Sequence, residues 1–237
     1  MARQTRLYVP RIEAGPVRVT GPEAHHARSV LRLGAGETVE LFDGAGRSAA
    51  AQVRSADKDA LELTVGEIRT DPPAETRLVL ATAIPKGPVQ PCLVSHAAEV
   101  GVDAFWPVVC RYSAVRDVSA ARWQRWLVET CKQSGRNSLP EVAEPVTLAE
   151  ALDRTGDFDL KVFGSTQTDQ LAREPLAKAW RTAIVFVGPE GGLCDEEERL
   201  LIERGVQPVR LGHYVMRVET AAAALAALLI GNREPRR

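Results

Sequence analysis

The chain has 237 residues, of which 26% are charged and 45% apolar, and its formal net charge is −1 at pH 7. This length suits one large domain or two modest ones, and the composition is ordinary for a globular protein with a real core. The near-zero charge excludes a polycation, so any nucleic-acid binding has to use local patches of charge.

The cysteine pattern and the apolar runs exclude several further classes. Cys92, Cys110, Cys131 and Cys194 are far apart and form no CxxC pair, so we expect free thiols in a reducing compartment and no metal site. The longest apolar stretch, 221–230, is shorter than the ~20 residues of a membrane span, and no secretory signal is seen. We therefore expect a cytoplasmic protein with no membrane association.

The first seventy residues predict a small β-barrel with one helix. A helix is expected from about Pro22 to Leu33, and Asp43-Gly44-Ala45-Gly46 is typical of a hairpin turn. The prolines of Asp71-Pro72-Pro73-Ala74 indicate a linker, so the expected domains are 1–72 and 73–237. Short segments with alternating or β-branched residues predict strands at 7–9, 16–20, 37–42, 48–53 and 61–68.

The remainder of the chain alternates strands with helices, which indicates a parallel α/β domain. Leu78 to Ile84 is a near-continuous apolar run, as expected for a strand that is buried on both faces. Further strands are predicted at 104–109, 160–163, 183–187 and 209–211. Helices are predicted at 91–100, 119–134, 195–204 and 219–230.

A glycine-rich loop, Gly188-Pro189-Glu190-Gly191-Gly192, follows one of these strands and precedes a helix. Ligands bind at such places in α/β sheets, but the loop matches neither the dinucleotide nor the P-loop pattern. The next helix opens with four carboxylates, Asp195 to Glu198, which would repel a phosphate at the helix N-terminus. A ligand with a cationic centre, such as a sulfonium, is compatible; a tight turn before a well-capped helix is the alternative.

A second segment, Leu211 to Ala221, combines a strand end, an irregular stretch and the start of an alanine-rich helix. The pattern G-P-E-G-G, then Leu211-Gly212, then V-M-R-V-E-T-A at 215–221 resembles the RsmE family of ribosomal RNA methyltransferases. Weaker matches occur in order along nearly the whole chain: His26, Val30-Leu31-Arg32, Gly36, Val39, Phe42-Asp43-Gly44, Pro85-Lys86-Gly87, Glu99-Val100-Gly101-Val102, Pro107, Gln133-Ser134-Gly135-Arg136 and Pro140.

The resemblance implies a fold and an activity. It implies a SPOUT α/β trefoil-knot methyltransferase domain at 73–237 and a PUA-like β-barrel RNA-binding domain at 1–72. A knot does not follow from periodicity, because chains generally do not thread loops. The implied reaction is methyl transfer from S-adenosylmethionine to N3 of a uridine in 16S rRNA of the small ribosomal subunit, by a homodimer and without a metal.

The resemblance also assigns site residues. Uracil N3 carries a proton, so a base has to remove it or a cation has to stabilise the uridinate. Arg217 is the first candidate for a catalytic electrostatic role and Arg136 the second, while Glu219 or Glu190 is either the base or structural. The implied cofactor-binding residues are Val187, Gly188, Pro189, Glu190, Gly191, Gly192, Leu211, Gly212, Val215, Met216, Arg217, Glu219 and Thr220.

An RNA-facing surface is expected near the N-terminus. Arginines stand at positions 3, 6, 11, 18, 28 and 32. The residues expected to bind RNA are Arg6, His26, Arg28, Arg32 and Arg136, and a merely solvated face is the alternative. Trp123 and Trp126 either stack on bases or, at their helical spacing, belong to the core. The target imide lies on the Watson–Crick edge, so a paired uridine has to be flipped out.

The chain departs from the family pattern at several positions. The family's K-G-D-R reads Lys86-Gly87-Pro88-Val89 here, and its E-R-S reads Arg111-Tyr112-Ser113. His96, Cys194 and Val218 also replace the usual residues. The alternatives are therefore a SPOUT-like enzyme with another RNA target, an RNA-binding protein with little catalysis, and an enzyme with a phosphate-containing cofactor, which the acidic helix start disfavours.

Overall fold

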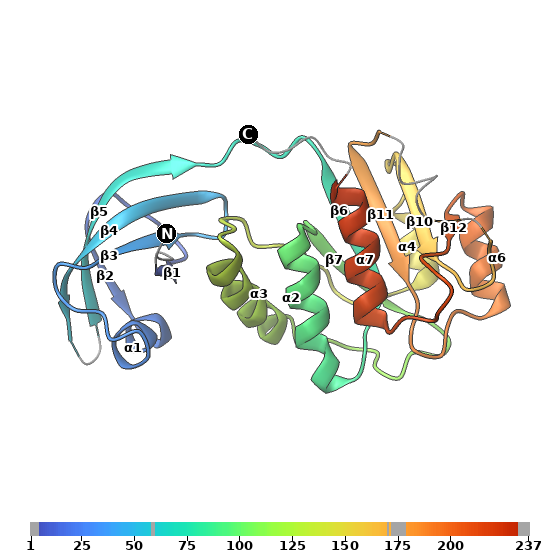
Figure 1. Cartoon of the computed structure of the whole chain (residues 1–237), viewed down its shortest axis with the longest axis horizontal. Helices are drawn as coiled ribbons and strands as arrows, with labels where there is room; N and C mark the ends of the chain where they lie inside the picture. Colours follow the sequence, from blue (N-terminus) through green and yellow to red (C-terminus); the bar gives the residue numbers. More distant parts are fainter. Residues whose placement is uncertain (1–4, 58–59, 170, 172–178, 232–237) are drawn as a thin grey trace. The chain divides into compact units, whose positions relative to one another are not determined.

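The computed structural model describes residues 5–57, 60–169, 171 and 179–231. The chain forms two compact units, one of Met1–Pro73 with Val128–Leu139 and the other of Ala74–Leu127 with Pro140–Arg237 (Figure 1). The segment Val128–Leu139, which we expected in the second domain, thus packs with the first unit. The helix α3 (Ala120–Ser134) contributes residues to both units.

The first unit is built on a five-stranded sheet with the order β1-β3-β4-β5-β2. Its strands pair antiparallel except β1 with β3, which are parallel. The helix α1 (Pro22–Ser29) is shorter than predicted. Arg32 has a φ of 55°, a left-handed conformation that a helix cannot contain. The strand bounds are β1 Arg6–Tyr8, β2 Gly15–Thr20, β3 Thr38–Phe42, β4 Arg47–Ala56 and β5 Ala60–Thr70.

Arg6 ties the segment 128–139 to this sheet. Its guanidinium donates to the backbone carbonyls of Cys131 at 2.6 Å and Arg136 at 3.1 Å, and to the side-chain oxygen of Asn137. It also forms an ion pair with Glu40 at 2.9 Å. The contacts of Arg6 with residues 131–137 join positions more than a hundred residues apart, so no local sequence pattern indicates them.

The second unit contains a parallel sheet with the order β12-β10-β11-β6-β7-β8, in which β9 also pairs with β7. The predicted strand at 209–211 lies two residues earlier in the structure. The strand bounds are β6 Arg77–Ala83, β7 Ala104–Val109, β8 Glu141–Val142, β9 Val146–Thr147, β10 Leu160–Gly164, β11 Thr182–Val187 and β12 Gln207–Val209.

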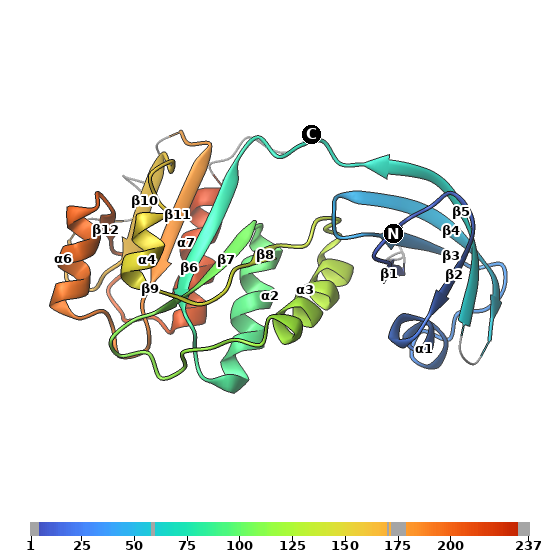
Figure 2. The ribbon, with the colours of Figure 1, turned by 180° about the vertical axis from the view of Figure 1, so that it is seen from behind.

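Helices cover both faces of this sheet (Figures 1 and 2). The helices α2 and α7 pack together on one face, and α7 also contacts β6 and β11. On the other face α4 and α6 bury Leu148, Leu152 and Leu201 against Phe163 and Phe186. This double coverage explains the continuous apolar strands. The helix bounds are η1 Gly87–Val89, α2 Gln90–Val100, α4 Leu148–Asp153, α6 Asp195–Glu203 and α7 Val218–Gly231.

The path of the chain after β12 positions the site. The edge strand β12 ends at Val209, and α7 begins at Val218 over the middle of the sheet. The connecting residues 210–217 therefore run back along the carboxyl end of the sheet, past the loop that follows β11 (Figure 2). Two segments that both carry a motif are brought together in this way. None of the helices in the described ranges is long and apolar enough to cross a membrane.

Candidate functional site

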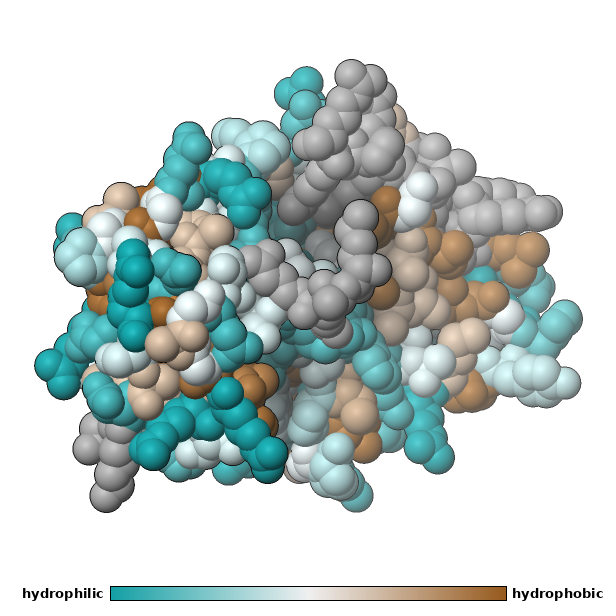
Figure 3. All heavy atoms as spheres, turned by 60° about the vertical axis from the view of Figure 1, so that its left-hand side comes forward, coloured by the Kyte–Doolittle hydropathy of each residue, from teal (hydrophilic) through white to brown (hydrophobic). Residues whose placement is uncertain are grey.

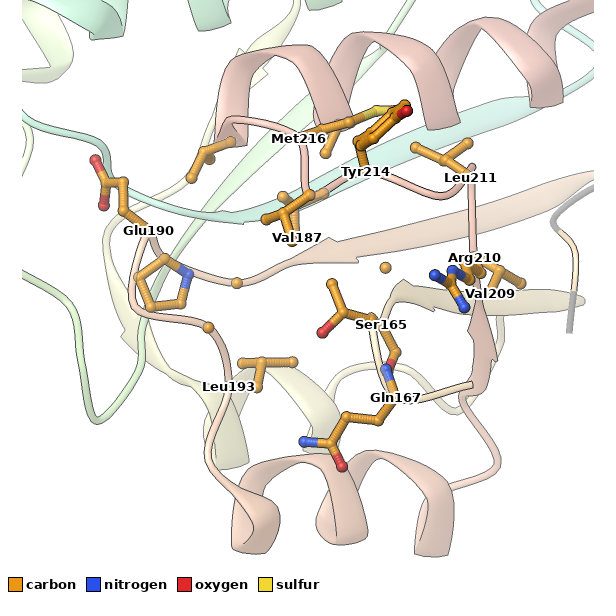
Figure 4. A pocket seen from close by; sticks show the side chains of 18 of the residues that line it. Ser165, Gln167, Val187, Glu190, Leu193, Val209, Arg210, Leu211, Tyr214 and Met216 are labelled. Carbon is orange, nitrogen blue, oxygen red and sulfur yellow. The ribbon is translucent and has the colours of Figure 1, made fainter. Parts of the chain in front are cut away.

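A pocket of about 550 Å³ lies at the carboxyl ends of β10, β11 and β12 (Figure 4). Loops at this edge of an α/β sheet commonly hold ligands, and the volume lies within the usual range for small-molecule sites. The lining residues are Gly164, Ser165, Thr166, Gln167, Val187, Gly188, Pro189, Glu190, Gly191, Gly192, Leu193, Glu198, Val209, Arg210, Leu211, Gly212, His213, Tyr214, Val215, Met216, Val218 and Ala221.

The loop after β11 has no space for side chains at two of its glycines. A Cβ added to Gly188 would lie 2.9 Å from Cγ of Leu193, and one added to Gly191 would lie 3.0 Å from Cβ of Tyr112. Gly192 has a φ of 77°, which only glycine adopts without strain, and its N–H donates to the carbonyl of Pro189 at 2.9 Å. The loop is thus a close-packed turn whose backbone faces the pocket.

The acidic start of α6 is held by backbone amides. The carboxylate of Glu197 accepts from the N–H of Cys194 at 3.0 Å and from that of Arg111 at 2.7 Å. The carboxylate of Glu196 lies 3.9 Å from the Arg111 guanidinium. Glu197 therefore caps the helix, both carboxylates contact the neighbouring loop at Arg111, and their negative charge disfavours an anion at this helix end.

Glu198 differs from these carboxylates because it lines the pocket. The Ser165 hydroxyl donates to its two carboxylate oxygens at 3.1 and 3.3 Å, while the N–H of Gln167 donates to the same hydroxyl at 3.0 Å. Burial and the nearby charge of Asp195 raise the pKa of Glu198, and the bond from Ser165 opposes this only in part. A negative charge in this wall is thus poorly compensated by the protein.

The opposite wall is formed by the segment before α7. Figure 4 shows Leu211, Tyr214 and Met216 on the side of the pocket across from Ser165 and Gln167. This segment is fixed by Arg210, because its guanidinium donates to the carbonyls of Gly212 at 2.9 Å and His213 at 3.4 Å. The guanidinium also lies 3.7 Å from the carboxylate of Asp169.

The structure brings most of the predicted cofactor residues together. Those in the pocket lining are Val187, Gly188, Pro189, Glu190, Gly191, Gly192, Leu211, Gly212, Val215 and Met216. Arg217, Glu219 and Thr220 are outside the lining, at the start of α7. Arg217 is exposed, and its side chain has no hydrogen bond or ion pair to the residues that the structure describes.

The segment Gly164–Gln167, together with Glu198, was missed by the sequence reasoning. Gly164 ends β10, and Ser165 to Gln167 follow it, so they occupy the same kind of place as the loop after β11. The rule that ligands lie beyond the carboxyl ends of neighbouring parallel strands could have indicated them. In the sequence, Glu198 is one of four consecutive acidic residues, and nothing distinguishes it from the other three.

The predicted RNA-binding residues have different environments. Arg6 is wrong as a surface contact, because its side chain is 5% exposed and its guanidinium is bound inside the first unit. Arg28 and Arg32 are exposed, and His26 is half-buried. Arg136 belongs to the first unit, where its Nε donates to the carbonyl of Ser138 at 2.6 Å, and it is not in the pocket lining. The arginine at position 3 lies outside the described residues.

The tryptophan and cysteine side chains that could have stacked on RNA bases or bound a metal were also located in the structure. Trp123 is fully buried, donates its indole N–H to Oε1 of Gln90 at 3.1 Å, and packs edge-on against Phe105. This confirms the core interpretation for Trp123. All four cysteines are free thiols. Within the described residues, no three or more His, Cys, Asp or Glu side chains form a group that could hold a metal ion.

Comparison with known proteins gives family matches for most of the chain. Residues 72–230 match the RNA methyltransferase domain family, and residues 19–66 match the RNA methyltransferase PUA domain family. The chain is 31% identical to "Ribosomal RNA small subunit methyltransferase E" of Mycobacterium tuberculosis, with 89% of this chain and 84% of that protein covered. It is 30% identical to the protein of that name from Synechocystis, with 96% and 77% covered.

Two solved structures are similar to this chain over nearly its whole length. The ribosomal RNA small subunit methyltransferase E of Neisseria gonorrhoeae, bound to S-adenosyl methionine, is 31% identical with a TM-score of 0.84, and 94% of this chain and 95% of that chain are covered. A putative methyltransferase of Legionella pneumophila with bound cofactor SAM is 26% identical with a TM-score of 0.88, covering 97% and 98%. The fold is therefore the expected α/β fold with a PUA-like N-terminal domain, and the chain belongs to the ribosomal RNA small subunit methyltransferase E family, the RsmE family.

Proposed function

We propose that this chain is a cytoplasmic enzyme that transfers the methyl group of S-adenosylmethionine to N3 of a uridine in 16S rRNA of the small ribosomal subunit. The observation that carries the proposal is the meeting of two motif segments, 187–192 and 211–216, in one pocket. Neither segment alone distinguishes a ligand site from a tight turn. In a chain of this family, both segments in one pocket support a binding site for the methyl donor.

The pocket fits this cofactor chemically. Val187, Leu211 and Met216 give apolar surface for a purine ring, and the packed glycine loop offers backbone groups for polar contacts. Glu198 and the acidic start of α6 favour a positively charged ligand over a phosphate. When bound, S-adenosylmethionine supplies a methyl group on a positively charged sulfur.

We assign the principal catalytic role to Arg217. It follows Met216, which lines the pocket, and its exposed side chain has no partner among the described residues. A guanidinium beside the target base would stabilise the uridinate that forms when the N3 proton leaves. The proton passes to a base, for which Glu190 at the pocket and Glu219 at the start of α7 are the candidates. Arg136, the second candidate for the electrostatic role, serves better as an RNA contact.

The first unit is proposed to hold the RNA. Arg28 and Arg32 are exposed there beside the half-buried His26, and such residues contact phosphates and bases. Figure 3, which turns the left-hand side of Figure 1 towards the viewer, shows mostly hydrophilic side chains with smaller groups of apolar ones between them. Binding of the rRNA through this unit leaves the pocket of the second unit for the reaction.

We also propose that the active form is a homodimer. Large apolar side chains near the pocket are exposed in the single chain: Tyr112 by 53%, Tyr214 by 89% and Val215 by 81%. Monomeric proteins seldom expose adjoining large apolar side chains of this kind, whereas subunit interfaces bury them. Light scattering should give twice the chain mass of 25.7 kDa, and a monomer at working concentration would contradict the proposal.

The proposed activity is tested with small ribosomal subunits that lack the modification. The purified chain and S-adenosylmethionine carrying a labelled methyl group are incubated with these subunits, and the rRNA is digested to nucleosides. The expected product is labelled 3-methyluridine. Label in another nucleoside would indicate a different RNA target, and cofactor binding without transfer to RNA would indicate a binding protein.

A further inference from the structure

We propose that Glu198 recognises the positive charge of S-adenosylmethionine, and that Ser165 positions its carboxylate for this purpose. The inference rests on the proposed function, because it concerns how that same pocket selects its cofactor. The two sequence motifs supply only loop residues to the pocket. Glu198 would add an electrostatic contact from the helix α6.

The carboxylate of Glu198 is held in a fixed position by Ser165. Ser165 is 7% exposed and has one hydroxyl proton. The N–H of Gln167 donates to its oxygen at 3.0 Å, so the hydroxyl proton is directed to Glu198, whose oxygens lie 3.1 and 3.3 Å away. A carboxylate accepts about four hydrogen bonds, so most of the capacity of Glu198 remains for a ligand in the pocket.

The charge of this carboxylate is poorly balanced by its surroundings. Over the described ranges of the chain, no Lys, Arg or His forms an ion pair with Glu198. The guanidinium of Arg210 also lines the pocket, but it binds the carbonyls of Gly212 and His213 and lies near Asp169. Glu198 is therefore a half-buried carboxylate without a cationic partner among the residues that the structure describes.

The other carboxylates at the start of α6 lie outside the pocket lining. Glu196 pairs with the guanidinium of Arg111, and Glu197 accepts hydrogen bonds from the backbone N–H groups of Cys194 and Arg111. Neither Glu196 nor Glu197 lines the pocket. Asp195 is exposed and raises the pKa of Glu198 further by its charge. A positive group of the ligand would offset both the desolvation of the Glu198 carboxylate and its repulsion by Asp195. Such charge-assisted contacts are stronger than neutral ones.

S-adenosylmethionine carries positive charge at two places, the sulfonium and the α-ammonium group. S-adenosylhomocysteine retains only the ammonium, and methylthioadenosine has neither at neutral pH. Comparing the three ligands shows whether Glu198 recognises charge and, if so, which of the two centres it contacts. The adenosine part is common to all three, so its contacts cancel.

The experiment is titration calorimetry of the full chain with these three ligands. Glu198→Gln keeps the shape and the Ser165 bond but removes the charge, and Glu203→Gln, on the same helix and exposed, is the matched control. We expect Glu198→Gln to weaken S-adenosylmethionine binding about tenfold to a hundredfold. Methylthioadenosine binding should stay within about twofold, as should all binding by Glu203→Gln.

The other ligands and the Ser165→Ala variant show which positive centre of the cofactor Glu198 contacts. A parallel loss for S-adenosylhomocysteine assigns Glu198 to the ammonium, whereas a loss confined to S-adenosylmethionine assigns it to the sulfonium. Ser165→Ala should reproduce part of the loss without affecting methylthioadenosine. Unchanged S-adenosylmethionine binding by Glu198→Gln, or an equal loss for methylthioadenosine, would overturn the inference. If the wild-type chain did not bind S-adenosylmethionine, the proposed function itself would fail.

Discussion

Gly188 lies directly against the side chain of Leu193: a Cβ added to Gly188 would be 2.9 Å from Cγ and 3.2 Å from Cδ2 of Leu193. Real Cβ atoms do not approach other carbons this closely. The first glycine of the loop is therefore required by packing and not by its backbone conformation. The loop closes on Leu193, which itself lines the pocket.

Gly188→Ala should push Leu193 or the loop into the pocket and weaken S-adenosylmethionine binding by about tenfold, the cost of modest overpacking. Titration calorimetry measures this. Gly156→Ala is the matched control, because an added Cβ there meets nothing within 4 Å. The double variant Gly188→Ala/Leu193→Ala should bind better than additivity of the single variants implies. Strictly additive losses would show that the contact does not constrain the loop.

Arg217→Ala should reduce methyl transfer to small ribosomal subunits by about a hundredfold or more, as expected when a preorganised electrostatic group is removed. S-adenosylmethionine binding should change little, because Arg217 is outside the pocket lining. Single-turnover rates and calorimetry separate the two effects. Arg199→Ala, an exposed arginine on α6, should leave both unchanged. Near-normal turnover in Arg217→Ala would remove its assigned role.

Arg6→Ala should lower the free energy of unfolding by about 3 kcal/mol, because it leaves Glu40 with Arg69 as its remaining cation and leaves the carbonyls of Cys131 and Arg136 without this donor. Arg6→Lys should retain the charge but lose the planar fork and recover only part of this. Chemical denaturation followed by circular dichroism gives both values. Arg11→Ala is the control, since its pair with Glu13 is exposed on both sides. Equal stability of the Arg6 and Arg11 variants would contradict the role of Arg6.

Arg28→Ala and Arg32→Ala should weaken RNA binding and each lower the slope of log affinity against log salt by about one. Both side chains are exposed in the first unit, as a phosphate contact requires. Fluorescence anisotropy with a fragment of small-subunit rRNA over a range of salt measures the slope. An unchanged slope in both variants would place the RNA surface elsewhere.

Cys110 and Cys131 should be unreactive in the native chain. Burial raises the pKa of the Cys110 thiol to about 12 and that of Cys131 to about 11, so neither forms a thiolate at about pH 8. The exposed Cys92 should react with an aromatic disulfide reagent, and all four thiols should react in denaturant. Fast native labelling of Cys110 would contradict the packing around β7.

The same two shifts determine how stability changes at alkaline pH. Both folded-state pKa values are raised above the unfolded value of 9.0, so the native state keeps protons that the unfolded state loses. Their contribution to stability is complete below about pH 9 and is lost as the pH rises towards 12. Cys110→Ala should flatten this decline, whereas Cys92→Ala should not.

The sequence was sufficient for elements whose signal is local. The apolar run from Leu78 predicted a buried strand, which the structure contains, and the glycine loop at Gly188, predicted to hold a ligand, lies in the wall of a pocket. The helix α4 was missed because its six residues are too few for a helical period, although Thr147 and Glu150 form a capping box that marks its start. For α3 the sequence predicted the helix, in which Cys131 lies at helical spacing, but it did not predict that the end of this helix packs with the first unit.

Side-chain partners that are distant in sequence could not be predicted. An arginine is expected at the protein surface from its residue type alone. Only the folded chain shows that Glu40 and the segment 128–139 bury Arg6. Ser165 and Glu198 are likewise 33 residues apart, and neither belongs to a motif. Their contact depends on the order of β10 and β11 in the sheet, which periodicity does not determine.

The most direct test of the central claim is mass spectrometry of 16S rRNA nucleosides from cells that carry this chain and from cells in which its gene has been deleted. We expect one 3-methyluridine per small subunit to disappear on deletion and to return with the wild-type chain but not with Arg217→Ala. An unchanged 3-methyluridine content after deletion, or loss of a different modified nucleoside, would contradict it.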